Sequence, residues 1–235
     1  MSRGSTVTPA ARQKAPGARR GASSSGKSAS GAPEVVTPKQ RERRDRIEAA
    51  AYAVVAEVGY KRASLLTIAR RAPASNETLY NWYSNKAGLF RSLIEGNARQ
   101  ANAVLQEALS GATDPLATLE RLGPVLLTMV TGERAITLNR AAVGDLGDTD
   151  SLGAAIAQWG RDAVAPLLAR LLGSAMADGA LRCDDPATAA DVYIRLLIGD
   201  LQVRRMIGIK APLGDDEVNL RAGQALELFL RLYRA

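Results

Sequence analysis

The chain has 235 residues, enough for two domains with cores of their own. It contains no histidine and a single cysteine, Cys183, which excludes an intramolecular disulfide and argues against zinc sites and against hydrolases that rely on histidine. Hydrophobic residues make up 46% of the chain and aromatic residues only 4%, a balance that favours an all-α protein rich in alanine and leucine. We therefore expect neither an enzyme nor a site for a cofactor or metal.

The net charge of +7 is unevenly distributed along the chain. Residues 1–40 carry a net charge of +6, residues 41–96 carry +4 and residues 97–235 carry −3. A basic amino-terminal half is typical of a protein that meets a polyanion there. No apolar run reaches the roughly eighteen residues of a membrane span, and the start of the chain lacks the apolar core of a signal peptide. These features predict a reduced, cytoplasmic protein with no membrane partner.

Residues 1–37 are rich in serine, glycine, alanine and proline, with scattered basic residues. They hold too few large apolar residues to offset the entropy lost on ordering, so we predict a disordered basic tail. Its residues 21–28, GASSSGKS, match the phosphate-binding loop pattern, but a true loop of this kind follows a buried strand. We interpret the match as chance. The basic residues of the tail either add phosphate contacts without sequence preference or only keep the protein soluble.

A first helix is predicted from Pro38 to about Gly59, where the glycine suits the position just after a helix. The apolar residues with helical spacing are Ile47, Ala50, Ala51, Val54 and Val58. A basic cluster lies at the start of this helix and consists of Lys39, Arg41, Arg43, Arg44 and Arg46. The cluster either contacts a nucleic acid backbone or forms a solvated helix face.

Residues 64–86 follow the pattern of two short helices joined by a tight turn. The first helix has Ser64 as its N-cap, and Pro73 ends it because the residue before a proline is disfavoured in the α region. Its apolar stripe consists of Leu65, Ile68, Ala69 and Ala72. Ser75 caps the second helix, whose Leu79 and Tyr83 point inward. The open face carries Asn76, Glu77, Thr78, Tyr80 and Asn81. This is the layout of a helix-turn-helix, whose second helix lies in the major groove of DNA.

The same stretch resembles the amino-terminal domain of TetR/AcrR-type transcriptional regulators. The matching residues are Ser64, Ile68-Ala69, Thr78-Leu79-Tyr80, Trp82-Tyr83 and Asn85-Lys86, and the resemblance covers about residues 39–96. It implies a three-helix DNA-binding domain over residues 38–88 and a helical effector-binding and dimerisation domain over residues 89–235. It also implies a homodimer on a palindromic double-stranded DNA operator, usually a repressor, that a small-molecule effector releases.

The candidate DNA contacts follow from this layout. Short polar side chains on a helix in the major groove read base edges, so we assign base contacts to Asn76, Thr78 and Asn81. Tyr80 and Lys86 match the phosphate-gripping positions of the family. Further contacts to the DNA backbone could come from hydroxyls at helix termini and from one indole. These groups belong to Ser64, Thr67, Ser75 and Trp82.

Two residues depart from the family pattern. Pro73 stands where the family usually has glycine, and proline cannot adopt the positive φ of glycine, which leaves the geometry of the turn open. Glu77 stands where the family tends to have a small residue. This acid either accepts a hydrogen bond from a cytosine amino group or turns away from the DNA.

The rest of the chain is helical in pattern. Lys86 opens a helix that continues to about Leu109, about 30 Å long, and links the two domains. Further helices are predicted over residues 115–131 with an interruption at Pro124, over 133–144, as a helix or bent pair ending near Ala177 with Pro166 inside it, over 186–208, and from Asp215 to the end. Residues 144–153 hold spaced aspartates without the EF-hand spacing, so we predict a loop there and no calcium site.

The resemblance implies that the last two helices pair with their copies in a second subunit, and the alternative is ordinary packing within one chain. It places the effector pocket among the helices between about residues 100 and 180. Polar or aromatic candidates there are Thr128, Asn139, Arg140 and Trp159, each of which could also be a surface or core residue. An effector-independent or architectural DNA-binding protein stays open as an alternative, and a filled core in this region would favour it.

Overall fold

A computed structural model of the protein describes residues 37–111, 113–144 and 151–235. The predicted tail lies outside the described residues, apart from Thr37. The phosphate-loop match and the aspartates of the predicted loop also lie outside them. Within them the chain is helical apart from one isolated bridge between Leu181 and Arg234. The predicted all-α class is confirmed.

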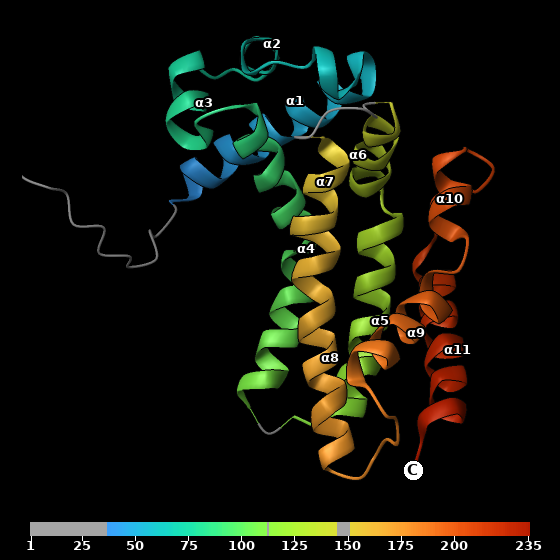
Figure 1. Ribbon diagram of the computed structural model, residues 1–235. Coiled ribbons are helices and arrows are strands. Elements are labelled where there is room, and N and C mark those ends of the chain that lie inside the picture. The colour runs from blue at the N-terminus through green and yellow to red at the C-terminus, as the bar shows by residue number, and fades with distance from the viewer. Residues whose placement is uncertain (1–36, 112, 145–150) are drawn as a thin grey trace, which may run out of the picture. The chain divides into compact units, whose positions relative to one another are not determined.

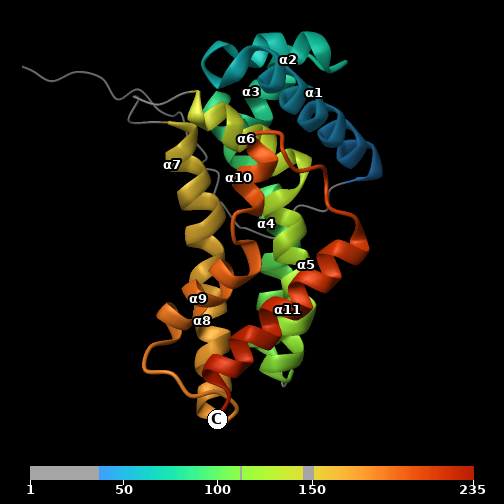
Figure 2. The same cartoon turned by 90° about the vertical axis from the view of Figure 1, so that its right-hand side faces the viewer.

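The amino-terminal helices are α1 (Pro38–Arg62), α2 (Leu65–Arg71), α3 (Asn76–Tyr83) and α4 (Lys86–Ser110). They are followed by α5 (Pro115–Thr131), α6 (Glu133–Val143), α7 (Leu152–Ile156), the π-helical turn η1 (Ala157–Arg161), α8 (Asp162–Ala177), α9 (Pro186–Ile198), α10 (Leu201–Met206) and α11 (Asp215–Tyr233). Figure 1 shows α4, α5 and α8 running side by side. Helix α9 packs on α8, and α11 packs on α5 and α9 (Figure 2).

Helix α1 begins with a capping box in which Thr37 and Gln40 bond each other's backbone N–H groups. Helical geometry stops at Gly59, which has a φ of 75°, and one further turn reaches Arg62. The predicted break at Gly59 is therefore present, although the helix resumes after it. Helix α6 packs against α1 and so joins the carboxyl-terminal helices to the amino-terminal ones.

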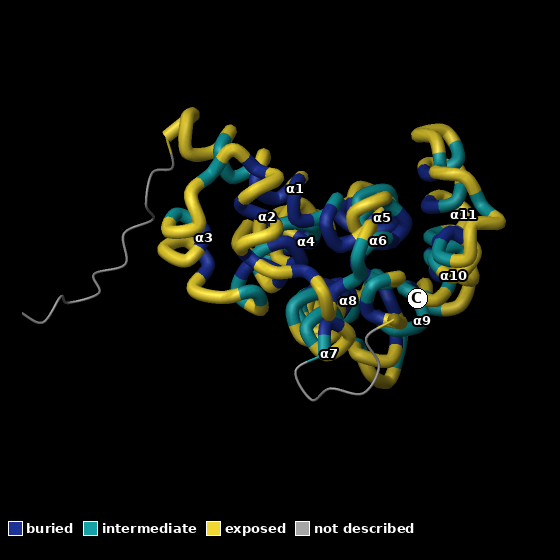
Figure 3. The backbone as a smooth tube through the Cα atoms, turned by 90° about the horizontal axis from the view of Figure 1, so that it is seen from above, coloured by how far each residue is buried: buried dark blue, intermediate teal, exposed yellow. Residues whose placement is uncertain are grey.

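The buried residues form two clusters. The first joins α1, α2, α3 and the start of α4, as far as Ile94, to Leu138 and Ala142 of α6 and Leu152 of α7. The second joins the rest of α4, from Ala98 on, to α5, α8, α9 and α11. Figure 3 shows the buried positions gathered where the helices face one another. Helix α4 therefore contributes to both cores and connects them physically.

Two expectations for the second half of the chain were wrong. Pro124 does not interrupt α5, and Glu120, whose carbonyl loses a helical partner there, lies on an exposed face. The helix predicted over residues 186–208 is split at Gly199, which has a φ of 53°. Arg221 of α11 donates to the carbonyls of Leu196 and Leu197, so the end of α9 is satisfied by another helix.

Other expectations for this half agree with the structure. The chain is helical without a gap from Leu152 to Ala177, with the π-helical turn η1 between α7 and α8, five residues before Pro166. Asp185 caps α9 and Pro186 is its first residue. On α11 the buried stripe consists of Val218, Ala222, Ala225 and Phe229, whereas Leu232 is 63% exposed and Leu228 is 47% exposed.

Candidate nucleic-acid interface

Helix α2 is fixed by its cap and by its buried side. The Ser64 hydroxyl accepts from the backbone N–H of Thr67 at 3.1 Å and also pairs with the Thr67 hydroxyl. Leu65, Ile68 and Ala69 are buried, while Ser64 and Thr67 are exposed. The two hydroxyls therefore hold the first turn of α2 and stay accessible to solvent.

The turn between α2 and α3 accommodates Pro73 without strain. The backbone N–H of Ala74 donates to the carbonyl of Ala72 at 2.6 Å, a bond between residues i and i+2 that closes a γ-turn across Pro73. The fixed φ of proline is close to the value that an inverse γ-turn needs. None of residues 72–75 has a positive φ. The turn thus connects α2 to α3 without needing a glycine.

Helix α3 presents the predicted open face. Asn76, Glu77, Tyr80 and Asn81 are exposed, while Leu79 is fully buried and Tyr83 is 5% exposed. Ser75 accepts from the backbone N–H of Thr78 and caps the helix. Two amides, one acid and one phenol are therefore free to approach a groove. The position of Glu77 in the first turn also suits the positive end of the helix dipole.

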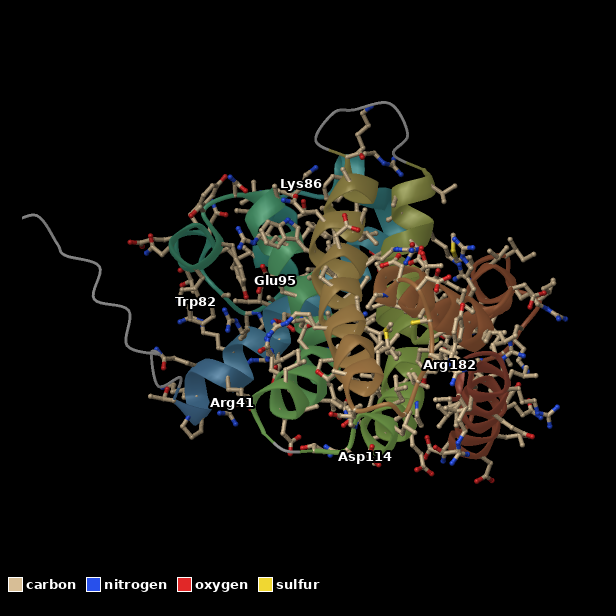
Figure 4. All side chains as sticks on the ribbon, turned by 60° about the horizontal axis from the view of Figure 1, so that its bottom comes forward. Arg41, Trp82, Lys86, Glu95, Asp114 and Arg182 are labelled. Carbon is tan, nitrogen blue, oxygen red and sulfur yellow. The ribbon has the colours of Figure 1, made fainter. Side chains whose placement is uncertain are left out.

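Thr78 differs from its neighbours because another helix holds it. Its hydroxyl accepts a hydrogen bond from Arg43 of α1 at 2.8 Å and pairs with the Ser75 hydroxyl at 2.7 Å. The Arg43 guanidinium also lies 5.5 Å from the ring centre of Trp82. Figure 4 shows Trp82 on α3 beside the first turns of α1, where Arg41 projects. Sequence reasoning missed this contact because Arg43 and Thr78 are 35 positions apart.

Lys86 lies at the corner between α4 and the end of α1. Its ammonium group donates to the carbonyl of Tyr60 at 3.1 Å and lies 4.3 Å from the centre of the Tyr60 ring. Helix α4 begins at Lys86 as predicted, and Asn85 caps it by accepting from the backbone N–H of Gly88. Lys86 thus anchors α4 to α1 through the Tyr60 carbonyl.

A cavity of about 350 Å³ lies among α4, α5, α6, α7, η1, α8, α9 and α10. Its walls are mainly aliphatic, for example Ile94, Leu126 and Ile194. The polar lining residues are Asn97, Asn139, Arg161 and Gln202. A mainly apolar cavity with a few polar groups is the usual form of a small-molecule site.

Of the four predicted pocket residues, Asn139 lines this cavity, whereas Thr128, Arg140 and Trp159 do not. Thr128 is exposed on α5. Arg140 donates to the carbonyls of Met206 and Arg205 and so caps the end of α10. Trp159 packs against the first core, with the Arg91 guanidinium 3.7 Å from its ring centre.

In the described ranges, no group of three or more acidic or cysteine side chains could hold a metal ion. Over the same ranges, no helix is long and apolar enough to cross a membrane.

An exposed reading helix in a helix-turn-helix, joined through α4 to a helical core with a cavity, defines a helix-turn-helix transcriptional regulator. The family model for bacterial regulatory proteins of the tetR family matches residues 47–93. The model for the carboxyl-terminal domain of AefR-like transcriptional repressors matches residues 117–235, half of the chain. The chain belongs to the TetR family of DNA-binding transcriptional regulators.

Solved structures share this fold. A TetR transcriptional regulator from Agrobacterium tumefaciens is 28% identical, with a TM-score of 0.62 over 82% of this chain and 95% of that one. A TetR-family regulator from Pseudomonas syringae is 25% identical, with a TM-score of 0.58 over 84% and 98%. FadR from Bacillus subtilis, solved with stearoyl-CoA, is 17% identical, with a TM-score of 0.58 over 79% and 96%. No curated protein matches the chain significantly.

Proposed function

We propose that the protein is a homodimeric repressor that a small molecule releases from a palindromic operator. The observation that carries the proposal is the shared helix α4. It supplies Ile94, Asn97 and Ala98 to the cavity, and Leu89, Phe90 and Leu93 to the first buried cluster, here called the DNA-binding core. A ligand that favours one position of α4 would change the position of α3. Release then follows from the differential affinity of the ligand for the two arrangements.

A second connection runs through α6. Leu138 and Asn139 line the cavity, while Leu138 and Ala142 also belong to the DNA-binding core. The same helix packs against α1, whose Arg43 holds Thr78 of the reading helix. The cavity therefore touches α4, which packs against α3, and α6, which is linked to α3 through α1.

For the DNA contacts, we propose that Asn76 and Asn81 read bases from the exposed face of α3. Thr78 joins them through the part of its hydroxyl that Arg43 and Ser75 leave accessible, and Glu77 reads a base only where a cytosine amino group faces it. Contacts to the DNA backbone are proposed for Ser64, Thr67, Ser75, Tyr80, Trp82 and Lys86. Lys39, Arg41 and Arg46, which are exposed on α1, would extend the phosphate contacts.

For the dimer, we propose an isologous interface built from α9 and α11. Helix α11 leaves three leucines exposed, Leu220 at 64%, Leu228 at 47% and Leu232 at 63%. Leu228 also lines a groove between α9 and α11 together with Leu196. Pairing with a second copy would remove this apolar surface from water. Two reading helices are needed because one monomer contacts only a few base pairs.

The test is transcription in a purified system from the promoter upstream of the protein's own gene. The protein should reduce transcription, and at least one apolar compound from a small-molecule panel should restore it. Ala165→Leu, which fills part of the cavity, should repress normally but lose this response, while Ala163→Leu, at a position outside the cavity lining, should keep it. Repression that no compound relieves would favour the effector-independent alternative, and activation would contradict the proposed repressor.

A further inference from the structure

The carbonyl groups at the end of α5 are bonded in a way that fixes two of the amides in the cavity wall. A helix leaves its last four carbonyls without partners inside the helix. Here Thr128 O accepts from the backbone of Gly132, and Thr131 O accepts from Arg205. The other two are met by side chains that line the cavity, because Met129 O accepts from Asn97 and Val130 O accepts from Gln202, both at 3.0 Å.

The third amide of the cavity wall, Asn139, does not bond a carbonyl at the end of a helix. Its side-chain nitrogen donates to Ala135 O at 2.9 Å, one turn back along α6. That carbonyl already lies inside the helix and bonds the backbone N–H four residues later. The hydrogen bond therefore orients the Asn139 amide without being needed to satisfy the helix.

The orientation of all three amides follows from their partners. A backbone carbonyl only accepts hydrogen bonds, so the amide atom beside it must be the nitrogen. Each amide can thus offer its oxygen to the cavity. In the described ranges these three oxygens accept no hydrogen bond from protein groups, and none of them belongs to the fully buried polar atoms.

The charges around the cavity favour a neutral ligand at this end. Each of the three amides can offer an oxygen acceptor and one remaining N–H donor, so a group that both donates and accepts suits them better than a carboxylate, which only accepts. Among the described residues of the lining, Arg161 is the one cation, and it pairs with Asp191 at 2.5 Å. A hydroxyl group could instead donate to an amide oxygen, and the remaining walls are aliphatic.

We propose that the cavity binds a neutral, mainly aliphatic molecule that carries a hydroxyl group, held by Asn139 with Asn97 and Gln202, and that it discriminates against carboxylates. This assignment rests on the proposed function, in which the same cavity is the effector site. A site built to bond a hydroxyl rejects analogues without one, since its own polar groups are then left unpaired.

The test compares three probes of similar length by calorimetry with the full chain, namely 1-decanol, its methyl ether 1-methoxydecane, and decanoate. The alcohol should bind about tenfold more tightly than either of the other two, a difference of about 1.4 kcal/mol. Asn139→Leu should reduce the gap between alcohol and ether to about twofold while ether binding is kept. Asn102→Leu, an amide on the same helix as Asn97 but outside the cavity lining, should leave the gap unchanged.

Decanoate binding as tightly as decanol, or a gap that survives Asn139→Leu, would overturn the inference. The absence of binding by all three probes would also overturn it. The proposed function is judged separately, by whether any panel compound that competes for the cavity restores transcription. A carboxylate that binds the cavity and releases DNA would thus defeat the inference and support the proposed function.

Discussion

The polar side chains of α3 divide into two groups. Asn76 and Asn81 keep their amides exposed, whereas the Thr78 hydroxyl is engaged by Arg43 and Ser75. An exposed asparagine can make the paired contacts to the N6 and N7 atoms of adenine, while a tethered threonine has less freedom to do so. We therefore expect the two asparagines to carry most of the base discrimination.

Asn76→Ala should weaken binding to the preferred duplex by about 1–3 kcal/mol and leave binding to a scrambled duplex nearly unchanged. Fluorescence anisotropy with both duplexes measures this difference. Gln106→Ala, an exposed amide far along α4, is the control and should change neither affinity. An equal loss on both duplexes would show that Asn76 acts on the DNA backbone or on folding.

Glu48 is a buried acid of α1 that lies near arginines of α1, α4 and α6. It is 8% exposed, and burial raises its pKa above the ordinary value of 4.5, while the nearby Arg134, Arg44 and Arg99 oppose this shift. Since the raised pKa favours the protonated form in the folded state, the stability that Glu48 contributes is present below pH 4.5 and is lost as pH rises through the folded pKa.

Glu48→Gln should therefore have a higher urea midpoint than the natural chain at pH 7, with the difference vanishing near pH 4. Urea unfolding followed by circular dichroism at the two pH values measures it. Glu42→Gln, which changes a side chain that is 70% exposed, should leave the midpoint nearly unchanged at both. A lower midpoint for Glu48→Gln at pH 7 would mean that pairing with the arginines outweighs the cost of burial.

At the level of elements, the corner between α3 and α4 is set by backbone geometry. Ser84 has a φ of 64°, unusual for a residue other than glycine. A Cβ atom on Gly88 would lie 2.1 Å from the carbonyl oxygen of Tyr83, a backbone atom that cannot move alone. The position of α3 on α4 thus depends on the missing side chain at Gly88.

Gly88→Ala should destabilise the protein by about 1–3 kcal/mol, the usual range for overpacking, and weaken DNA binding. Gly96→Ala is a matched control in the same helix, because its Cβ would meet only the end of Arg99 at 3.7 Å. That change should be neutral or stabilise by up to about 1 kcal/mol, since glycine is the poorer helix former. Equal effects of the two substitutions on thermal unfolding would contradict this account of the corner.

The sequence predicted these elements best where the signals are local. Ser64, Ser75 and Asp185 are caps that lie two or three residues from the backbone groups they bond. The break at Gly199 was missed because a glycine inside a helical pattern does not by itself end a helix, and the partner of the broken end, Arg221, is 22 positions away in sequence.

Contacts between distant residues account for most of what could not be predicted at the site. Lys86 meets the Tyr60 carbonyl, and Arg140 caps α10 from 66 positions away. Lys86 was assigned to phosphate because it matches the family pattern, and Arg140 to the pocket because it is polar and lies in the expected region. Their protein partners could not be seen in the sequence. Asn139 was named because it is a polar residue inside the predicted pocket region of about residues 100–180, whereas Asn97 and Gln202 lie outside that region and were missed.

At the level of the whole molecule, the proposed dimer depends on the exposed leucines of α11. Leu228→Glu should convert the dimer to a monomer, which sedimentation at micromolar concentration measures. The affinity for the operator should fall at least tenfold, because one protein molecule no longer binds both half-sites. Val143→Glu changes another exposed apolar residue, on α6, and should leave the dimer intact. A dimer that survives Leu228→Glu would place the interface elsewhere.

The central claim is that α3 reads a DNA sequence. The most direct measurement is equilibrium binding to duplex DNA from upstream of the protein's own gene and to a scrambled duplex of equal length, across a salt series. Sequence reading predicts tighter binding to the upstream duplex by about a thousandfold, two protomers per site, and a preference that persists as salt weakens both affinities. Equal affinities with the same steep salt dependence would contradict the claim and leave a basic protein that binds DNA without regard to sequence.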